Sequence, residues 1–223
     1  MNHRLRLTAL LALLFLTLAP TSVLSQASQA PPGPVVRYQF RTEGLPQPSP
    51  FNLVHNLTYF EPGSSTPFHT HPGQILVGVL DGQMTRRSHD GSETVYKAGE
   101  SWVERPNDVH QAFNAGASRS PLMVTYLLPK DAPLSQPVPG DTTPPPRPFV
   151  TYQFKTDVQP MTEPFDVVQL VQDFEPGAAT PFHTHPGVVV VTVLEGENTF
   201  SVNGAEKIYK AGESFVEVPG EVY

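Results

Sequence analysis

One phrase occurs twice in this sequence, and the repeat constrains the fold more than any other feature. Residues 61–73 read EPGSSTPFHTHPG, and residues 175–187 read EPGAATPFHTHPG. The run YKAGES likewise occurs at 96–101 and again at 209–214. Such self-similarity predicts two copies of one structural unit rather than a single large domain.

The repeats and the composition between them divide the chain into segments. The stretch between the repeats is rich in proline, cannot pair in a sheet and predicts an extended linker. From the N-terminus the predicted segments are a secretory signal peptide (1–27), a proline-rich lead-in (28–34), a first unit (35–130), the linker (131–148) and a second unit (149–223).

The N-terminal segment has the pattern of a secretory leader. A short basic start is followed by the apolar run 7–18 and then by small and polar residues. The run is shorter than the roughly 18 residues that suggest a spanning helix, although an uncleaved anchor remains an alternative. Cleavage would remove Arg4 and Arg6, so the formal net charge of −7 would become −9. We therefore expect an exported, periplasmic or extracellular protein that binds no nucleic acid and has no stable membrane insertion after leader removal.

The composition favours strands and excludes thiol chemistry. The sequence has no cysteine, so it contains no disulfide, thiolate metal site or nucleophilic thiol. Its 26 prolines favour short strands joined by turns over long helices. The apolar runs 75–80 and 188–194 are typical of strands that are buried on both faces. The sequence therefore predicts an all-β fold.

Histidine pairs are the candidate site residues. Side chains two apart on a strand point to the same face, so His69 and His71 are expected to lie together, as are His183 and His185. Two imidazoles on one wall of a barrel are the beginning of a divalent-metal site. A third histidine, His110, lies downstream in the first unit only.

The spacing of these residues resembles the two motifs of the cupin superfamily, in a two-unit, bicupin-like arrangement. The first motif is matched by Gly63, His69, His71 and Gly82, and most of the second by Gly99, Pro106, His110 and Asn114. The resemblance implies a duplicated double-stranded β-helix, which is a small jelly-roll barrel. It also implies a metal ion inside the first barrel, held by His69, His71 and His110.

The carboxylate of the family motif is missing. Its position is occupied by Ile75 in the first unit and by Val189 in the second. Gln74 could reach the metal only if Pro72 and Gly73 formed a bulge, because neighbouring strand residues face opposite ways. Imidazole ligands suit Fe, Mn, Zn, Ni or Cu better than magnesium or calcium. Glu104 and Glu217 recur in the two units and are candidates for acids that support the ligands.

The second unit is incomplete relative to the first. Tyr223 occupies the position of His110, so His183 and His185 predict at most a weak second site. Nothing in the sequence corresponds to residues 111–128 of the first unit, and we expect an unpaired sheet edge there.

The sequence is compatible with two classes of function, an enzyme and a non-catalytic binding module. We expect a metal-dependent enzyme of dioxygenase or isomerase type, acting on a small oxygen-rich or enolisable molecule. The alternative is a non-catalytic module that binds or senses a small ligand. No catalytic acid, base or nucleophile can be assigned from the spacing of residues. Arg86 and Arg87 are candidates to contact an anionic substrate. The chain could form a homodimer.

Overall fold

The computed structural model describes residues 31–143 and 146–223, and all regular elements in these ranges are β-strands. The predicted all-β fold is therefore confirmed. The signal peptide predicted for residues 1–27 lies outside the described residues. Within the described ranges no helix has the length and apolar character needed to cross a membrane.

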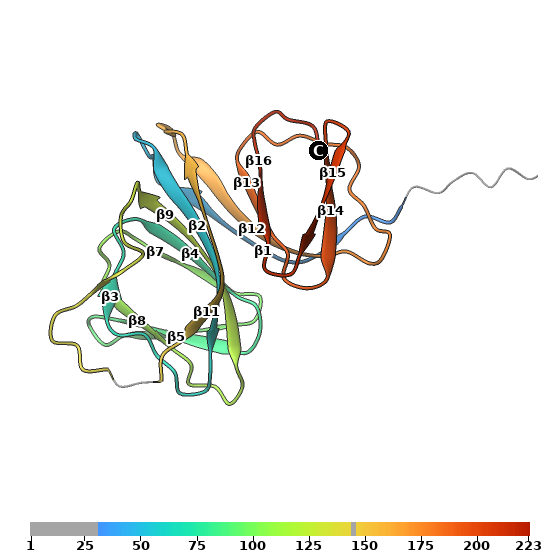
Figure 1. Ribbon diagram of the computed structural model, residues 1–223. Coiled ribbons are helices and arrows are strands. Elements are labelled where there is room, and N and C mark those ends of the chain that lie inside the picture. The colour runs from blue at the N-terminus through green and yellow to red at the C-terminus, as the bar shows by residue number, and fades with distance from the viewer. Residues whose placement is uncertain (1–30, 144–145) are drawn as a thin grey trace, which may run out of the picture. The chain divides into compact units, whose positions relative to one another are not determined.

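The first repeat forms a barrel of two five-stranded antiparallel sheets (Figure 1). The first sheet contains, in spatial order, β11 (Phe149–Val158), β2 (Phe51–Phe60), β9 (Ser120–Pro129), β4 (Gln74–Val79) and β7 (Ser101–Glu104). The second contains β10 (Gln136–Pro137), β3 (His69–Thr70), β8 (His110–Phe113), β5 (Gln83–Ser88) and β6 (Glu93–Lys97). Because β10 lies in the predicted linker, the expectation that this segment cannot pair in a sheet is wrong. Apolar side chains from both sheets, including Ile75, Met84, Trp102 and Leu122, form the core.

The remaining strands form three two-stranded antiparallel sheets. They are β1 (Val35–Gly44) with β12 (Phe165–Asp173), β13 (Val189–Thr192) with β16 (Ser214–Glu217), and β14 (Glu197–Val202) with β15 (Ala205–Lys210). Asn203 and Gly204 both have positive φ, at 51° and 78°, and connect β14 to β15. An Asn-Gly pair favours a two-residue hairpin turn, which is the turn formed here.

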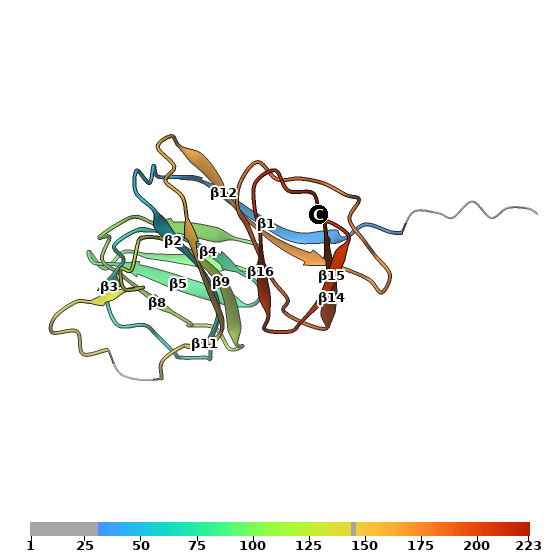
Figure 2. The same cartoon turned by 45° about the horizontal axis from the view of Figure 1, so that its top comes forward.

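The two repeats exchange their first strands. β1 belongs to the first repeat by sequence but pairs with β12 of the second, with Phe40 opposite Gln169. Its counterpart β11 pairs with β2 of the first repeat, with Phe154 opposite His55. Figures 1 and 2 both show the two pairs lying along each other. The repeats follow one another in the sequence, but the first strand of each repeat pairs with a strand of the other.

A second hydrophobic core contains residues of the exchanged strands, of β12 and of the first sheet of the barrel. It joins Phe40 of β1 to Leu76, Met123 and Leu127 of the barrel sheet and to Val167 of β12. The ring of Phe40 lies over the backbone of β4, where a Cβ built on Gly78 would stand 2.2 Å from it. A side chain at this position would push the exchanged strand off the sheet.

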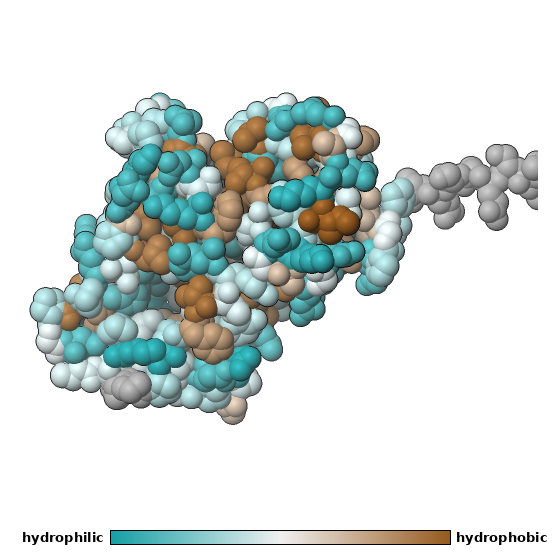
Figure 3. All heavy atoms as spheres, viewed as in Figure 1, coloured by the Kyte–Doolittle hydropathy of each residue, from teal (hydrophilic) through white to brown (hydrophobic). Residues whose placement is uncertain are grey.

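The second repeat is open where the first is closed. β9 joins β2 to β4 in the first repeat. Among residues 146–223 no strand corresponds to β9, and β12 and β13 lie in separate sheets. Val168 and Leu170 of β12 are 44% and 43% exposed, and Figure 3 shows apolar side chains at the surface of this repeat.

His55 and Gln169, which occupy the same position in the two repeats, converge on Thr125. Gln169 Nε2 donates to Thr125 Oγ1 over 2.7 Å, and the same oxygen lies 3.1 Å from His55 Nδ1. Because the threonine oxygen accepts from Gln169, its own proton is free to bond to His55, whose Nδ1 is then the acceptor. Burial lowers the pKa of the His55 imidazole to about 4, in keeping with this neutral ring.

We expect this histidine to make the fold sensitive to acid. Below pH 6.5 the unfolded chain protonates His55 while the folded chain does not, so stability falls as pH drops from about 6.5 towards 4. We expect a loss of about 2 kcal/mol from this residue, since its ring is only partly buried. Urea denaturation at pH 7 and pH 4.5 should therefore show a smaller acid effect for His55→Gln than for wild type. Equal losses in the two proteins would contradict this assignment.

Candidate metal centre

Three histidines from separate segments meet inside the first barrel. His69 opens β3 and pairs directly with His110, which opens β8, and His71 follows β3. The ring centroids are 4.4 Å apart for His69 and His110, 4.8 Å for His69 and His71, and 5.3 Å for His71 and His110. All three side chains are buried. The structure therefore brings together the three residues that the motif spacing selects.

Backbone carbonyls fix the orientation of all three rings. The Nδ1 atoms bond to carbonyl oxygens: His69 to Pro67 at 2.8 Å, His71 to Leu134 at 2.6 Å, and His110 to Asp108 at 2.9 Å. A carbonyl only accepts, so each Nδ1 must carry the proton. In the neutral tautomer each Nε2 then presents a lone pair, which is the arrangement found in histidine metal ligands.

A carboxylate completes the cluster. Glu104, the last residue of β7, places its Oε2 3.1 Å from Nε2 of His71 and its Oε1 3.0 Å from Nε2 of His110. The indole Nε1 of Trp102 donates to Oε1 over 2.8 Å and holds the carboxylate in place. Two atoms that bind one ion at about 2.1 Å and at right angles to each other lie about 3.0 Å apart. The ligand atoms of the three histidines lie within 4.8 Å of one another and fit a common ion, and Glu104 contacts two of the three rings.

The charges within the cluster depend on one another. Burial opposes ionisation of Glu104, but His110 and His71 outweigh it and hold its pKa well below the ordinary value. Burial likewise favours neutral His110, yet the adjacent Glu104 raises the pKa of that ring. For His69, burial and the neighbouring histidines lower the pKa to about 4. The pocket thus holds one carboxylate charge that attracts a cation.

His110 shows most directly that the donors suit a metal ion. Its Nε2 is buried and, although it lies close to Glu104, it has no hydrogen-bond partner of suitable geometry. A lone pair that faces a carboxylate oxygen is repelled unless a cation lies between them. That cation is either a second proton on the ring or a metal ion. Imidazole and carboxylate donors together suit a first-row divalent metal.

The carboxylate comes from a different strand than the family motif specifies. Ile75, at the motif position, is fully buried in the core and stands directly opposite Glu104 in the β4–β7 pair. The side chains of directly opposed residues lie on the same face of a sheet. Glu104 therefore reaches the cluster from the neighbouring strand. The recurrence of this acid in the second repeat was the only sequence signal for it.

Gln74 is engaged elsewhere. Its Nε2 donates to the carbonyl of Glu43 over 2.9 Å, and its Oε1 accepts from the backbone N–H of Leu45 over 2.8 Å. The side-chain amide thereby anchors the segment after β1. From Gln74 onward β4 pairs with β9 in regular register.

Two further polar residues face the barrel interior near the histidines. Arg86 lies on the same face of β5 as the core residue Met84, and its side chain is 15% exposed. It pairs with Asp108, and its buried Nε has no hydrogen-bond partner. The ring of Tyr126 lies 5.7 Å from that of His71, and burial raises the pKa of its phenol. A guanidinium and a protonated phenol therefore lie near the candidate metal ligands.

The side chain of Arg87 points away from the barrel interior. It pairs with Glu93 at the barrel surface and stacks over the ring of Phe113 at 4.6 Å. Of the two arginines considered as contacts for an anionic substrate, Arg86 alone points inward.

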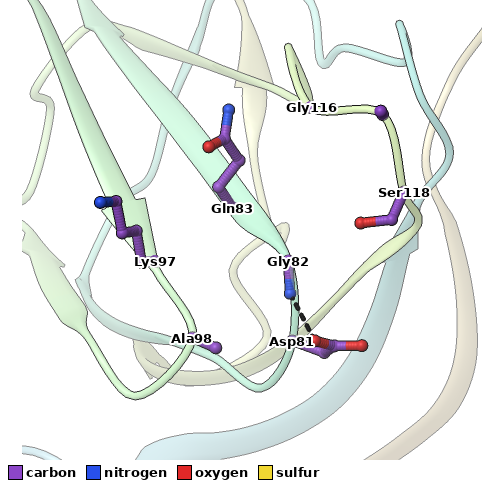
Figure 4. Close-up of a pocket in the computed structure, with 8 residues that line it drawn as sticks. Asp81, Gly82, Gln83, Lys97, Ala98, Gly116 and Ser118 are labelled. Atoms are coloured by element: carbon purple, nitrogen blue, oxygen red, sulfur yellow. Dashed lines mark hydrogen bonds between the residues drawn. The ribbon is translucent and has the colours of Figure 1, made fainter.

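One surface hollow lies at the other end of the barrel. It has a volume of about 510 Å³ and lies between the loops 81–83, 97–98 and 116–118 (Figure 4). Glu104 pairs with the beginning of β4, whereas Asp81 follows its end. The strands therefore separate the hollow from the histidine cluster, and the hollow brings no group of histidines or acids together.

A family model describes this arrangement of repeats. The cupin domain model matches residues 56–126 and 170–223, once in each repeat and over more than half of the chain. The chain belongs to the cupin family. The predicted two-unit organisation of this cupin is thereby confirmed, and its fold is the double-stranded β-helix. No curated protein matches the chain.

Three solved structures similar to this cupin each cover less than half of its chain. A cupin-like protein from Thermotoga maritima is 20% identical, covers 42% of this chain and 82% of its own, and has a TM-score of 0.34. A conserved protein with a double-stranded β-helix domain from Klebsiella pneumoniae is 26% identical, with coverages of 47% and 90% and a TM-score of 0.31. A predicted oxalate decarboxylase from Thermotoga maritima is 23% identical, with coverages of 33% and 64% and a TM-score of 0.31.

Proposed function

We propose that this cupin is an exported, metal-dependent enzyme that acts on a small oxygen-rich or enolisable anion. The divalent transition metal would be held in the first repeat by His69, His71, His110 and Glu104. The observation that carries the proposal is the convergence of three buried histidines, of which His110 has its Nε2 3.0 Å from a carboxylate oxygen without a hydrogen bond of suitable geometry. Export rests on the leader pattern of residues 1–27.

The other side chains of the pocket support an anionic substrate. A bound divalent ion would polarise a substrate oxygen as a Lewis acid. Arg86 supplies a fixed positive charge and N–H donors that match a carboxylate. Tyr126 keeps its proton, because burial raises the pKa of its phenol, and it can donate to an oxygen on which charge develops. A proton donor beside the ligands favours an enzyme over a module that only binds its ligand.

The metal content of purified protein tests the site. We expect His110→Ala to lose the ion of the first repeat after dialysis, because the neighbouring Glu104 and the two remaining histidines hold it more weakly. Elemental analysis of wild type and variant measures the difference. His89→Ala is the matched control, since His89 is exposed and lies outside the cluster. Equal metal contents in all three proteins would contradict the site.

Turnover separates the enzyme from the binding module. Oxygen uptake and product formation are measured with iron-, manganese- and zinc-loaded protein and a panel of small enolisable carboxylates. Turnover that disappears in His110→Ala supports the proposal. Binding of such anions without turnover by any metal form would instead make this cupin a non-catalytic binding or sensing module.

A further inference from the structure

Two buried polar atoms of the first barrel, outside the histidine cluster, have no hydrogen-bond partner among residues 31–143 and 146–223. They are Oδ1 of Asn56 on β2 and Nε of Arg86 on β5. A buried polar atom without a partner costs stability, so each one in a folded protein calls for an explanation. One of these atoms is an acceptor and the other a donor, and β2 and β5 belong to different sheets of the barrel (Figure 1). A ligand that satisfies both must carry a donor as well as an acceptor.

The side chain of Asn56 points into the barrel. It lies two residues after Val54 of the barrel core, and alternate residues of a strand share a face. Directly opposite it on β9 stands Val124, another core residue. The residue is only 1% exposed. Its unpartnered oxygen therefore faces the barrel interior rather than solvent.

The phenol of Tyr126 connects Asn56 to the candidate metal ligands. Burial and the nearby charge of Glu104 raise the pKa of that phenol, and the amide of Asn56 opposes the rise as a hydrogen-bond donor. The ring of Tyr126 lies 5.7 Å from that of His71. With Nδ2 turned to the phenol, Asn56 leaves Oδ1 as a free acceptor close to the ligands of the proposed metal ion.

Arg86 contributes the donor from the other sheet. It stands directly opposite Ala112 of the barrel core, so it shares the inward face of its sheet. Its terminal nitrogens bond to Ser88 and Asp108, which leaves Nε without a partner. A guanidinium held in this way offers a substrate carboxylate one N–H donor and a fixed positive charge.

The second repeat lacks both polar side chains. Leu170 occupies the position of Asn56, and Phe200 occupies that of Arg86. The ligand atoms of its candidate metal residues still lie within 4.8 Å of one another, namely those of His183, His185 and Glu217. The strand position of Asn56 thus accepts leucine in one repeat, so a buried amide is not required to form the strand.

We propose that Asn56 is a specificity residue of the first-repeat site, whose Oδ1 accepts a hydrogen bond from a hydroxyl group of a substrate with its carboxylate at Arg86. The proposed substrate class is thereby narrowed from oxygen-rich anions to hydroxycarboxylates. A carboxylate without a hydroxyl leaves the buried acceptor unpaired, and a site of this kind discriminates strongly against such an analogue. This inference rests on the function proposed above for the first repeat.

Binding of glycolate and acetate to the zinc-loaded full chain tests the subsite in a calorimeter, because the two anions differ by one hydroxyl. Wild type is expected to prefer glycolate, and Asn56→Leu to lose about tenfold or more in glycolate affinity while its acetate affinity is unchanged. Because this change removes an unpaired buried acceptor, the variant should also be at least as stable to urea as wild type. His55→Gln is the matched control, since it too introduces the second-repeat residue but on the opposite face of β2. It should leave both affinities unchanged.

The outcomes separate this subsite from the metal site. Retained zinc with the same glycolate preference in wild type and Asn56→Leu would overturn the subsite and leave the proposed enzyme intact, as would equal affinities for the two anions in wild type. A chain that holds no zinc contradicts the proposed enzyme, and the same comparison of anions on the metal-free chain then decides on the subsite. Asn56→Val is the second apolar variant and should lose the same preference. Marked destabilisation of both apolar variants would overturn the role, since the amide would then hold the fold rather than a ligand.

Discussion

Glu104→Gln is expected to lower the affinity of the first-repeat site for Zn²⁺ about 100-fold, and Ile75→Glu in the same chain to restore most of it. Glutamine keeps the shape of the side chain and can still accept the hydrogen bond from Trp102. It removes the negative charge that offsets the dication. Ile75 points into the barrel directly opposite Glu104, so a carboxylate there approaches the same ion from the position of the family motif.

Competition with a chromophoric chelator measures both affinities. The double variant Ile75→Gln/Glu104→Gln is the control for shape, because a glutamine at each position has the size of glutamate without its charge. Wild-type affinity in Glu104→Gln would mean that the carboxylate only positions His71 and His110. Ile75→Glu alone also adds a carboxylate at the motif position, which by itself would tighten the site. With Glu104 already present, the second carboxylate stands beside the first, so repulsion between them should cancel most of the gain.

The sequence predicted the fold because the relevant signals are local. The repeated phrase, the absence of helical periodicity and the motif spacing do not depend on which strands pair. The exchange of β1 and β11 between the repeats could not be predicted from such local signals. Tyr38-Gln39-Phe40 and Tyr152-Gln153-Phe154 are identical, so either strand carries the pattern needed to pair with β2 or with β12. In the structure the observed pairing is accompanied by the packing of Phe40 over Gly78 and by the ion pairs of β1 with β12, Arg37 with Asp173 and Arg41 with Asp166.

In the candidate site, too, some residues could be predicted from the sequence and others could not. His69, His71 and His110 follow from spacing, since a period of two residues and a motif fix their direction. Glu104 depends on the register of β7 against β4, which places it opposite Ile75. Register is a property of pairing between distant segments, so the sequence showed a recurring acid without showing where it lies. Gln74 fails as a ligand for a local reason, because it is one residue from Ile75 and faces the other side of β4.

Gly73→Ala is expected to destabilise the protein by about 3 kcal/mol, whereas Gly187→Ala, the same change in the second repeat, should be neutral or slightly stabilising. A Cβ on Gly73 would stand 1.9 Å from the carbonyl oxygen of Leu127 in β9. That oxygen belongs to the backbone of a central strand and cannot move aside without breaking the β4–β9 pairing. Around Gly187 nothing lies within 4 Å of a built Cβ.

Urea denaturation of both variants measures the difference, and thermal unfolding should show a fall in Tm of roughly 6–12 °C for Gly73→Ala. Because the variant site is two residues from His71, the metal-free proteins must be compared, so that lost metal affinity is not counted as lost packing. Similar stabilities for the two variants would mean that β9 does not approach Gly73 this closely. The repeated Pro-Gly would then reflect a turn common to both repeats. A large difference would show that the same glycine is required sterically only in the repeat whose barrel β9 closes.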